Sequence, residues 1–208
     1  RQLIAATVAG TKRPVTVKMR LGWDDASLNA AEIARLAEGE GAQMVTVHGR
    51  TRMQFYTGQA NWSHIAAVVD AIDLPVIANG DIEDEASARE AMKKSGAAGV
   101  MIGRGAEERP WRLAQISNAL FGTPYREPTR EEKLASMLNQ IGNSAELYGE
   151  RLGVRVVRKH VAAFVDAWCE DHGLPSMAET RVALCRIESP SALQDALAAA
   201  LTNRRDAA

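Results

Sequence analysis

The sequence lacks the features that mark membrane, secreted and metal-binding proteins. It has no run of eighteen apolar residues and no signal peptide, which disfavours a membrane span and secretion. Its two cysteines, Cys169 and Cys185, lie far apart and outside any CxxC pattern, and its four histidines show no metal-ligand spacing. We therefore predict reduced, buried cysteines, no metal site and a cytoplasmic location.

A strong charge of one sign is also missing. The 208 residues include 25 Lys and Arg and 26 Asp and Glu, which argues against broad electrostatic binding of nucleic acid but leaves local patches open. No GxGxxG motif follows a first strand, so a dinucleotide-binding Rossmann domain is disfavoured. The remaining composition, 46% hydrophobic and 25% charged, is that of an ordinary globular protein.

Four short apolar runs are present, each too short for a helix and bounded by turn-forming residues. They begin near residues 15, 44, 76 and 99, and helical patterns separate them. Such alternation predicts right-handed βαβ units and a parallel sheet. A (β/α)8 TIM barrel needs eight strands, so the α/β fold class predicted for residues 1–122 is the second half of such a barrel.

The helices expected in this half cover residues 1–10, 24–39, 62–71 and 83–94, with Ser27 as the N-cap of the second. A further helix opens at Pro110. Beyond residue 122 the strand signal ends, and an all-α helical bundle is predicted for residues 123–208. Its helices are expected at 129–148, 154–170, 178–187 and from 190 onward, the first beginning at a capping box.

Polar side chains follow each predicted strand at its carboxyl end, where parallel α/β folds bind ligands. They are Lys18, Arg20, His48, Asn79, Asp81 and Arg104, with Gly80 and Gly103 between them. Asn79-Gly80-Asp81 and Gly103-Arg104 are interpreted as phosphate-binding turns, although two ordinary tight turns fit the same letters. Lys18 either contacts an electron-rich ring or a phosphate, or pairs with a carboxylate. His48 orients a ligand, donates a proton or caps its loop.

A cationic face is predicted on the helix expected at 154–170 and just before it. Arg151, Arg155, Arg158 and Lys159 fall at spacings of three and four, so they share one side of a helix. Such a face contacts a nucleic-acid backbone or is simply solvated. On the same helix, Val161, Phe164 and Trp168 are interpreted as core residues.

Taken together, these motifs resemble the bacterial tRNA-dihydrouridine synthases, and most closely the B-type branch. The matching stretches in the barrel part are Val17–Arg20, Val47–Arg52, Ala78–Ile82 and Met101–Ala106, and Gly153–His160 is similar to the family's C-terminal domain. The order and spacing of the four barrel stretches are highly specific. The resemblance covers nearly the whole chain.

The resemblance implies an FMN enzyme that uses NADPH to reduce the C5=C6 bond of a uridine in tRNA, while a cysteine protonates C5. It implies that Lys18 and His48 contact the flavin, and that Asn79, Gly80, Asp81, Gly103 and Arg104 hold its phosphate. Arg20 would approach the flavin or the target base. Arg155, Arg158 and Lys159 would face the tRNA, and the target base must leave its stack to reach the flavin.

One departure from the family is expected to matter. The family's catalytic cysteine lies in an Asn-x-Gly-Cys-Pro stretch, which this sequence lacks. We therefore expect a fragment that begins after the fourth barrel strand, has no turnover alone and, with unpaired strand edges, is unstable or self-associates. Two other readings stay open: another FMN barrel oxidoreductase acting on a small molecule, which the cationic helical tail argues against, and a module that only binds RNA.

Overall fold

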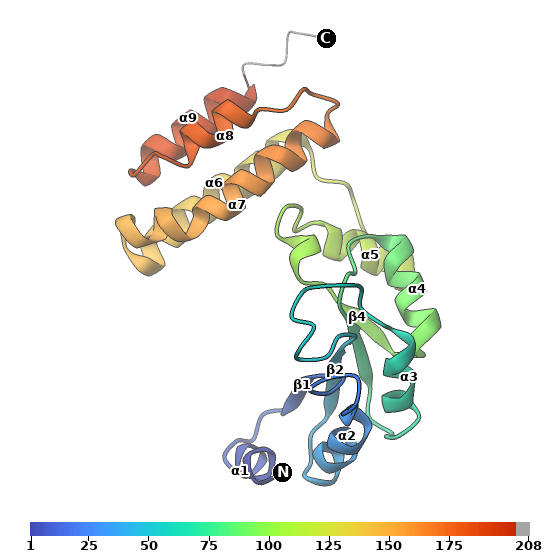
Figure 1. Ribbon diagram of the computed structural model, residues 1–208. Helices are drawn as coiled ribbons and strands as arrows, with labels where there is room; N and C mark the ends of the chain where they lie inside the picture. The colour runs from blue at the N-terminus through green and yellow to red at the C-terminus, as the bar shows by residue number, and fades with distance from the viewer. Residues whose placement is uncertain (203–208) are drawn as a thin grey trace. The chain divides into compact units, whose positions relative to one another are not determined.

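The computed structural model describes residues 1–202, which divide into two units (Figure 1). The barrel unit comprises Arg1–Ala106 and Arg112–Pro124. The helical unit comprises Glu107–Trp111 and the residues from Tyr125 onward. No helix in the described residues is both long enough and apolar enough to cross a membrane.

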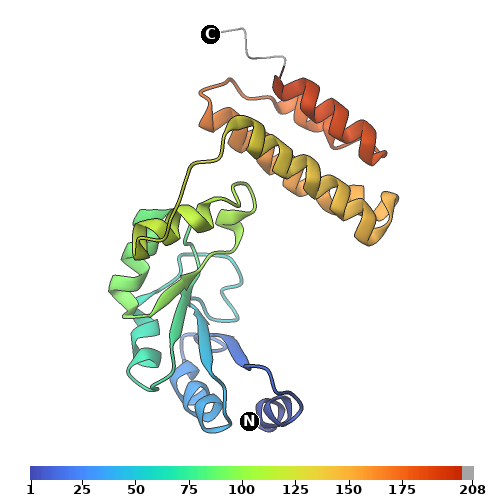
Figure 2. The same ribbon diagram turned by 180° about the vertical axis from the view of Figure 1, so that it is seen from behind.

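The barrel unit is built on a four-stranded parallel sheet in the order β1-β2-β3-β4, which confirms the predicted α/β class. The strands are β1 (Thr16–Arg20), β2 (Met44–His48), β3 (Val76–Asn79) and β4 (Gly99–Met101). The helices of this unit are α1 (Gln2–Ala9), α2 (Ala30–Gly39), α3 (Ser63–Val69), α4 (Glu85–Ser95), the 3₁₀ turn η1 (Arg104–Ala106) and α5 (Arg112–Phe121). Figures 1 and 2 show α2, α3 and α4 along the same side of the sheet.

The two faces of the sheet differ in character because side chains alternate along each strand. Val45, Val47, Val76 and Ala78 point to the helix-covered face, where they are buried with Ile65 of α3. The residues between them point to the opposite face, which carries most of the polar side chains predicted for the site. This division places the candidate site on one face of the sheet and the hydrophobic core on the other.

The start of the second helix was predicted wrongly. Asp24 and Ser27 form a turn rather than a cap: the Asp24 carboxylate accepts hydrogen bonds from the Ala26 N–H and the Ser27 hydroxyl. α2 begins only at Ala30, after Asn29, whose side chain makes no capping bond. Asp and Ser form such local turns as readily as they cap helices, so the sequence pattern alone does not separate the two outcomes.

The helical unit contains α6 (Arg130–Tyr148), α7 (Glu150–Asp171), α8 (Ala178–Leu184) and α9 (Pro190–Thr202) around one core. The Thr129 capping box is present: its side chain accepts from the Glu132 N–H, and the Glu132 carboxylate accepts from the Thr129 N–H. Phe164 and Trp168 are buried in the core, as predicted.

α7 begins four residues earlier than expected, and Gly153 explains why. This glycine lies inside the helix and against α6, where a Cβ atom would approach Ala145 Cα to 2.6 Å. The glycine therefore permits close helix packing rather than ending the helix. The segment before α5 joins this unit through Arg109, a buried side chain that pairs with Glu170 and Asp171 at 2.9 Å.

Candidate functional site

Strand register aligns three of the predicted site positions in one row, together with Met101. Arg20 pairs with His48, His48 with Asn79, and Asn79 with Met101 across the four strands. Paired residues of parallel strands point to the same face, so these side chains stand side by side at the carboxyl edge of the sheet. Lys18 occupies the same face one row below.

All eight residues predicted near the cofactor line one pocket of about 320 Å³. These are Lys18, Arg20, His48, Asn79, Gly80, Asp81, Gly103 and Arg104, and Tyr56, Ile82, Glu83, Met101 and Gly105 complete the lining. The structure therefore brings together residues that are spread over 87 positions of the sequence, from 18 to 104. Their roles toward a ligand stay predictions.

The pocket is electrostatically positive. Lys18, Arg20 and Arg104 supply three cations, and partial burial together with the Arg20 charge lowers the pKa of the Lys18 ammonium. Within residues 1–202 the Lys18 ammonium has no hydrogen-bond or ion-pair partner. A bound anion would relieve the repulsion among these three cations, and a ligand that carries a phosphate is such an anion.

His48 is neutral in this environment. Burial, followed by the charges of Arg20, Lys18 and Arg50, lowers the pKa of the His48 imidazole to about 4. At neutral pH the ring carries one N–H and one free nitrogen, so it contributes hydrogen bonds to the pocket rather than a fourth positive charge.

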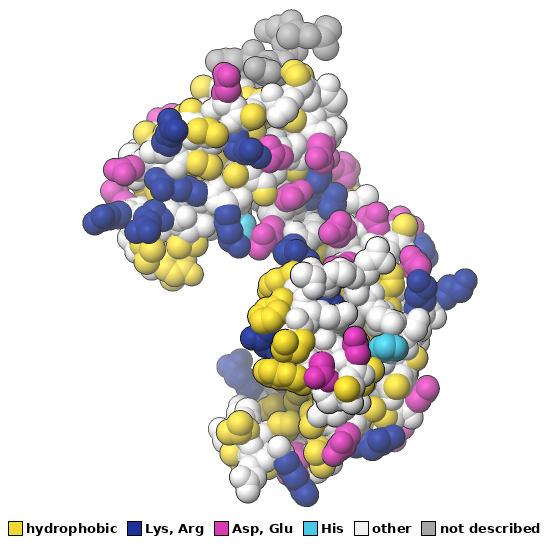
Figure 3. Space-filling view, viewed as in Figure 1, with side chains coloured by type: hydrophobic (Ala, Val, Ile, Leu, Met, Phe, Trp, Pro, Cys, Tyr) yellow, Lys and Arg dark blue, Asp and Glu magenta, His cyan; other side chains and the backbone are white. Residues whose placement is uncertain are grey.

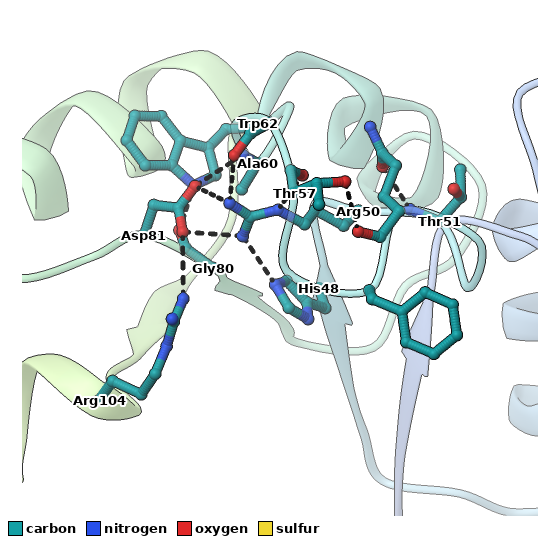
Figure 4. A network of polar contacts seen from close by, with 12 residues as sticks. His48, Arg50, Thr51, Thr57, Ala60, Trp62, Gly80, Asp81 and Arg104 are labelled. Carbon is teal, nitrogen blue, oxygen red and sulfur yellow. Dashed lines mark hydrogen bonds and ion pairs between the residues drawn. The ribbon is translucent and has the colours of Figure 1, made fainter.

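Asp81 is bound tightly within the protein (Figure 4). Its carboxylate receives two hydrogen bonds of 2.7 Å from the Arg50 guanidinium and one of 2.8 Å from the Ala60 N–H. Arg104 lies 3.8 Å away on the pocket side. Although burial opposes it, these bonds hold the pKa of the Asp81 carboxyl below its ordinary value. An ionised carboxylate repels a phosphate, so the geometry suits Asp81 better to orienting Arg104 than to touching the anion.

The predicted glycines and Asn79 shape the pocket floor. Gly80 has φ +110°, and a Cβ atom there would lie 2.6 Å from His48 Cδ2, so the ring packs directly on the glycine backbone. A Cβ at Gly103 would meet no atom within 4 Å, which leaves its backbone open to a ligand. The Asn79 amide donates to the Met101 carbonyl at 2.8 Å and links β3 to the end of β4.

Two residues of this region were not predicted as site residues. Arg50 is 2% exposed and connects the end of β2 to Asp81 and to the loop that follows. Its position two residues after His48, inside the matching stretch Val47–Arg52, is the sequence feature that could have identified it. Tyr56 is exposed and lies in the pocket wall with the Arg104 guanidinium 5.0 Å and the Arg20 guanidinium 5.8 Å from its ring. A single tyrosine in an irregular loop gives no periodic signal.

The predicted cationic face on α7 is only partly assembled. Arg151, Arg155 and Arg158 line a small pocket with Glu188, and Arg158 donates to the Ile187 carbonyl at 3.3 Å. Lys159 instead pairs with Glu107 at 3.0 Å. Figure 3 shows Lys and Arg side chains gathered over one side of the helical unit.

Neither cysteine belongs to the barrel unit, and neither lines its pocket. Cys169 is buried in α7, as predicted, whereas Cys185 is only half-buried and contacts the Arg158 carbonyl at 3.7 Å. Both are free thiols of the helical unit.

Comparison with known proteins agrees with this geometry. The Dihydrouridine synthase (Dus) family profile matches residues 1–204. A probable tRNA-dihydrouridine synthase of Rhodobacter capsulatus is 47% identical over 207 residues, which cover 99% of this chain and 61% of that protein. A second, from Rickettsia conorii, is 44% identical over 198 residues, 95% of this chain and 58% of that protein. The tRNA-dihydrouridine synthase B of Vibrio parahaemolyticus is 42% identical over 165 residues, 79% of this chain and 51% of that protein.

A half-barrel with a cationic pocket at its carboxyl edge, followed by a helical bundle, defines the class of protein. The chain belongs to the dihydrouridine synthase family, which confirms the resemblance drawn from its motifs. It spans about 60% of the length of the first relatives, at 61% and 58% of their residues.

Proposed function

We propose that this chain forms the flavin-binding and tRNA-binding part of a cytoplasmic FMN-dependent tRNA-dihydrouridine synthase. The observation that carries the proposal is the convergence of eight motif residues from four strand ends on one positive pocket. A helix-rich unit with an arginine-lined surface follows in the same chain, which favours a nucleic-acid substrate over a small molecule.

The residues present fit FMN by their chemistry. A phosphate needs cations and open backbone, and Arg104, Lys18 and the open Gly103 backbone supply them. A flavin ring needs hydrogen-bond partners for its polar edge, and the neutral His48 ring, with Lys18 beside it, supplies those. Bound there, FMN would take hydride from NADPH and deliver it to C5=C6 of uridine.

The chain's own residues then bind and orient. In this proposal Lys18 and His48 contact the ring, and Asn79, Gly80, Gly103 and Arg104 surround the phosphate. Asp81 belongs to the same group by motif and acts by aiming Arg104, since Arg50 already holds its carboxylate. Arg20 is assigned to the target base or the flavin, and its bonds to the Thr51 and Phe55 carbonyls, at 2.7 and 2.9 Å, hold its guanidinium at the pocket.

The pocket lining of this chain includes no cysteine to protonate C5, because neither Cys169 nor Cys185 is among the lining residues. We therefore propose that residues outside this chain supply the general acid and that the chain alone does not reduce tRNA. Arg155, Arg158 and Lys159 are assigned to tRNA, with Lys159 the weakest of the three because Glu107 already pairs with it.

Flavin content tests the proposal. The chain is purified alone and together with the upstream half-barrel of its Rhodobacter relative, and released flavin is quantified by fluorescence. We expect stoichiometric FMN in the joined protein, and its loss in Arg104→Ala but not in Arg89→Ala, a cation that is exposed on α4. Charge-assisted hydrogen bonds are worth about 1.5–3 kcal/mol, so Arg104→Ala weakens FMN binding roughly 10- to 100-fold. Absence of flavin from the joined protein would refute the proposal, as would tRNA reduction by the chain alone.

A further inference from the structure

Arg50 is the most heavily bonded side chain of the barrel unit's loops, and no role toward a ligand has been assigned to it. Its Nη1 donates to Asp81 at 2.7 Å and lies 3.5 Å from His48 Nε2, while Nη2 donates to Asp81 and to the Gly58 carbonyl. Nε donates to the Thr57 carbonyl at 3.1 Å. A guanidinium only donates, so the His48 nitrogen that faces it has to be the unprotonated one.

The Gly80 backbone approaches the same edge of the His48 ring. It comes so close that a Cβ atom would lie 2.6 Å from His48 Cδ2 and 2.8 Å from Nε2. Arg50 and Gly80 therefore both constrain the Cδ2–Nε2 edge of the ring, and Figure 4 shows the three residues together. Two independent contacts, one charged and one steric, define its orientation.

We propose that Arg50, with Asp81 as its counter-ion, is a positioning residue that orients His48 against the wall of the ligand pocket with its ring proton on Nδ1. The inference rests on the proposed function only for the identity of the ligand. In addition to holding the loop, the Arg50–Asp81 pair then determines which ring nitrogen of His48 donates a hydrogen bond and which accepts one.

The charged groups that face His48 support this assignment, because three of the four are cations. Lys18 and Arg20 come from β1, Arg50 from the loop after β2, and Asp81 from the turn after β3. Burial is the largest cause of the lowered His48 pKa, the three cations lower it further, and of these groups only Asp81 raises it, so that the pKa falls to about 4. Removing Arg50 subtracts a cation and also exposes the Asp81 charge, so both changes raise the His48 pKa.

Histidine NMR on the chain itself tests the proposal. Ring ¹⁵N and ¹³C shifts of labelled histidines report tautomer and pKa, and His48→Asn identifies the His48 signals among the four histidines. In the wild-type chain we expect the Nδ1–H tautomer of His48 and no titration above pH 5. We expect Arg50→Gln to move the His48 pKa toward its ordinary value of 6.5, and Asp81→Asn to leave the ring neutral. Arg50→Lys restores the charge and keeps the pKa low.

The outcomes separate the inference from the proposed function. An Nε2–H tautomer in the wild-type chain overturns the inference without any variant, and so does an unchanged His48 pKa in a folded Arg50→Gln chain. The double variant Arg50→Gln/Asp81→Asn removes the unpaired carboxylate, which keeps the test open if Arg50→Gln does not fold. The shift is still expected there, because the nearest cation is gone.

FMN titration of the joined protein, with and without Arg50→Gln, provides the second readout. Wild-type affinity for added FMN is expected to vary less than about twofold between pH 5.5 and 8, because His48 does not change charge, whereas Arg50→Gln makes it pH-dependent in that range. NMR results as expected without any FMN binding would leave the Arg50 inference standing and count against the proposed ligand.

Discussion

The chain holds two groups of clustered cations, and they are organised differently. In the barrel unit, Lys18, Arg20 and Arg104 converge on one pocket whose bound carboxylate, Asp81, is already neutralised by Arg50. In the helical unit, Arg151, Arg155 and Arg158 line a smaller pocket with Glu188, and Lys159 pairs with Glu107. The first arrangement suits a small anion, and the second suits an extended polyanion.

The origin of the difference lies in secondary structure. Parallel strands in register put equivalent residues at one edge and on one face, so charges that follow different strands are forced together. A helix of 22 residues spreads its cations along its length, so that Lys159 pairs with Glu107 while Arg158 donates to the Ile187 carbonyl. The cations therefore converge at the sheet edge and not along the helix, and the predictions below test this difference between the two units.

The largest effect is expected from opening the core of the helical unit. Phe164 is 2% exposed at the centre of that core, and Phe→Ala in such sites costs about 3–5 kcal/mol. Phe164→Ala should unfold the helical unit at lower denaturant, while amides of β2 and β3 keep their protection in hydrogen-exchange mass spectrometry. Val182→Ala, at an exposed site on α8, is the matched control and should cost under about 0.5 kcal/mol. Equal loss of protection in both units would show that their stabilities are coupled.

A smaller effect, confined to the pocket, is expected at Gly80. Its φ of +110° is strained for any other residue, and a Cβ would also strike the His48 ring. Gly80→Ala should cost about 1–3 kcal/mol in stability and displace His48. Gly58→Ala has φ +64° but meets no atom within 4 Å, so it reports backbone strain alone. If both variants bind FMN equally well in the joined protein, the Gly80–His48 contact does not matter for the ligand.

A still smaller, salt-dependent effect is expected on the cationic face of α7. Each phosphate contact contributes roughly 0.7–0.9 to the slope of log K against log salt, so Arg155→Ala should lower that slope for tRNA by about this amount. Lys159→Ala should change it less, because Glu107 already neutralises this cation. Binding is measured by filter retention at several salt concentrations, and Lys93→Ala on α4 of the barrel unit is the control. Equal slopes for all three variants would remove the face from the tRNA interface.

Much of the barrel unit could be predicted because its signals are local and repeated. Four apolar runs and their polar ends predicted the strands and the pocket lining, because parallel βαβ units bring the carboxyl ends of their strands to one edge of the sheet. The start of α2 was missed because Asp24 and Ser27 satisfy each other in a turn. The start of α7 was placed four residues too late, because the sequence does not show that Gly153 lies inside the helix and packs against α6.

Partners of single side chains were out of reach. Nothing in the spacing of α7 shows that Lys159 meets Glu107, 52 positions away, or that Arg50 takes both oxygens of Asp81, 31 positions away. Such pairs depend on which loop carbonyls and acids fold over the site. The sequence therefore indicated which residues gather at the pocket but not which of them are already engaged.

The smallest effect is expected on the pH dependence of stability, which should differ between the Asp84 cap of α4 and the Thr129 cap of α6. Asp84 caps α4 by accepting from the Ser87 side chain and backbone, and these bonds lower the pKa of its carboxyl below the ordinary value. A lowered folded-state pKa contributes stability that is present above the unfolded pKa of about 3.9 and is lost as pH falls through the folded value. Asp84→Asn keeps an acceptor but cannot titrate, so it should flatten the acid-side loss of barrel-unit stability.

Thr129→Ala should instead cost the helical unit about 1 kcal/mol at neutral pH, because the threonine cap carries no charge of its own. Urea unfolding from pH 3 to 7 measures the stability of both variants, and Asp25→Asn is the exposed control. If Asp84→Asn loses as much stability at low pH as the wild type, the Asp84 cap does not determine the acid sensitivity of the barrel unit.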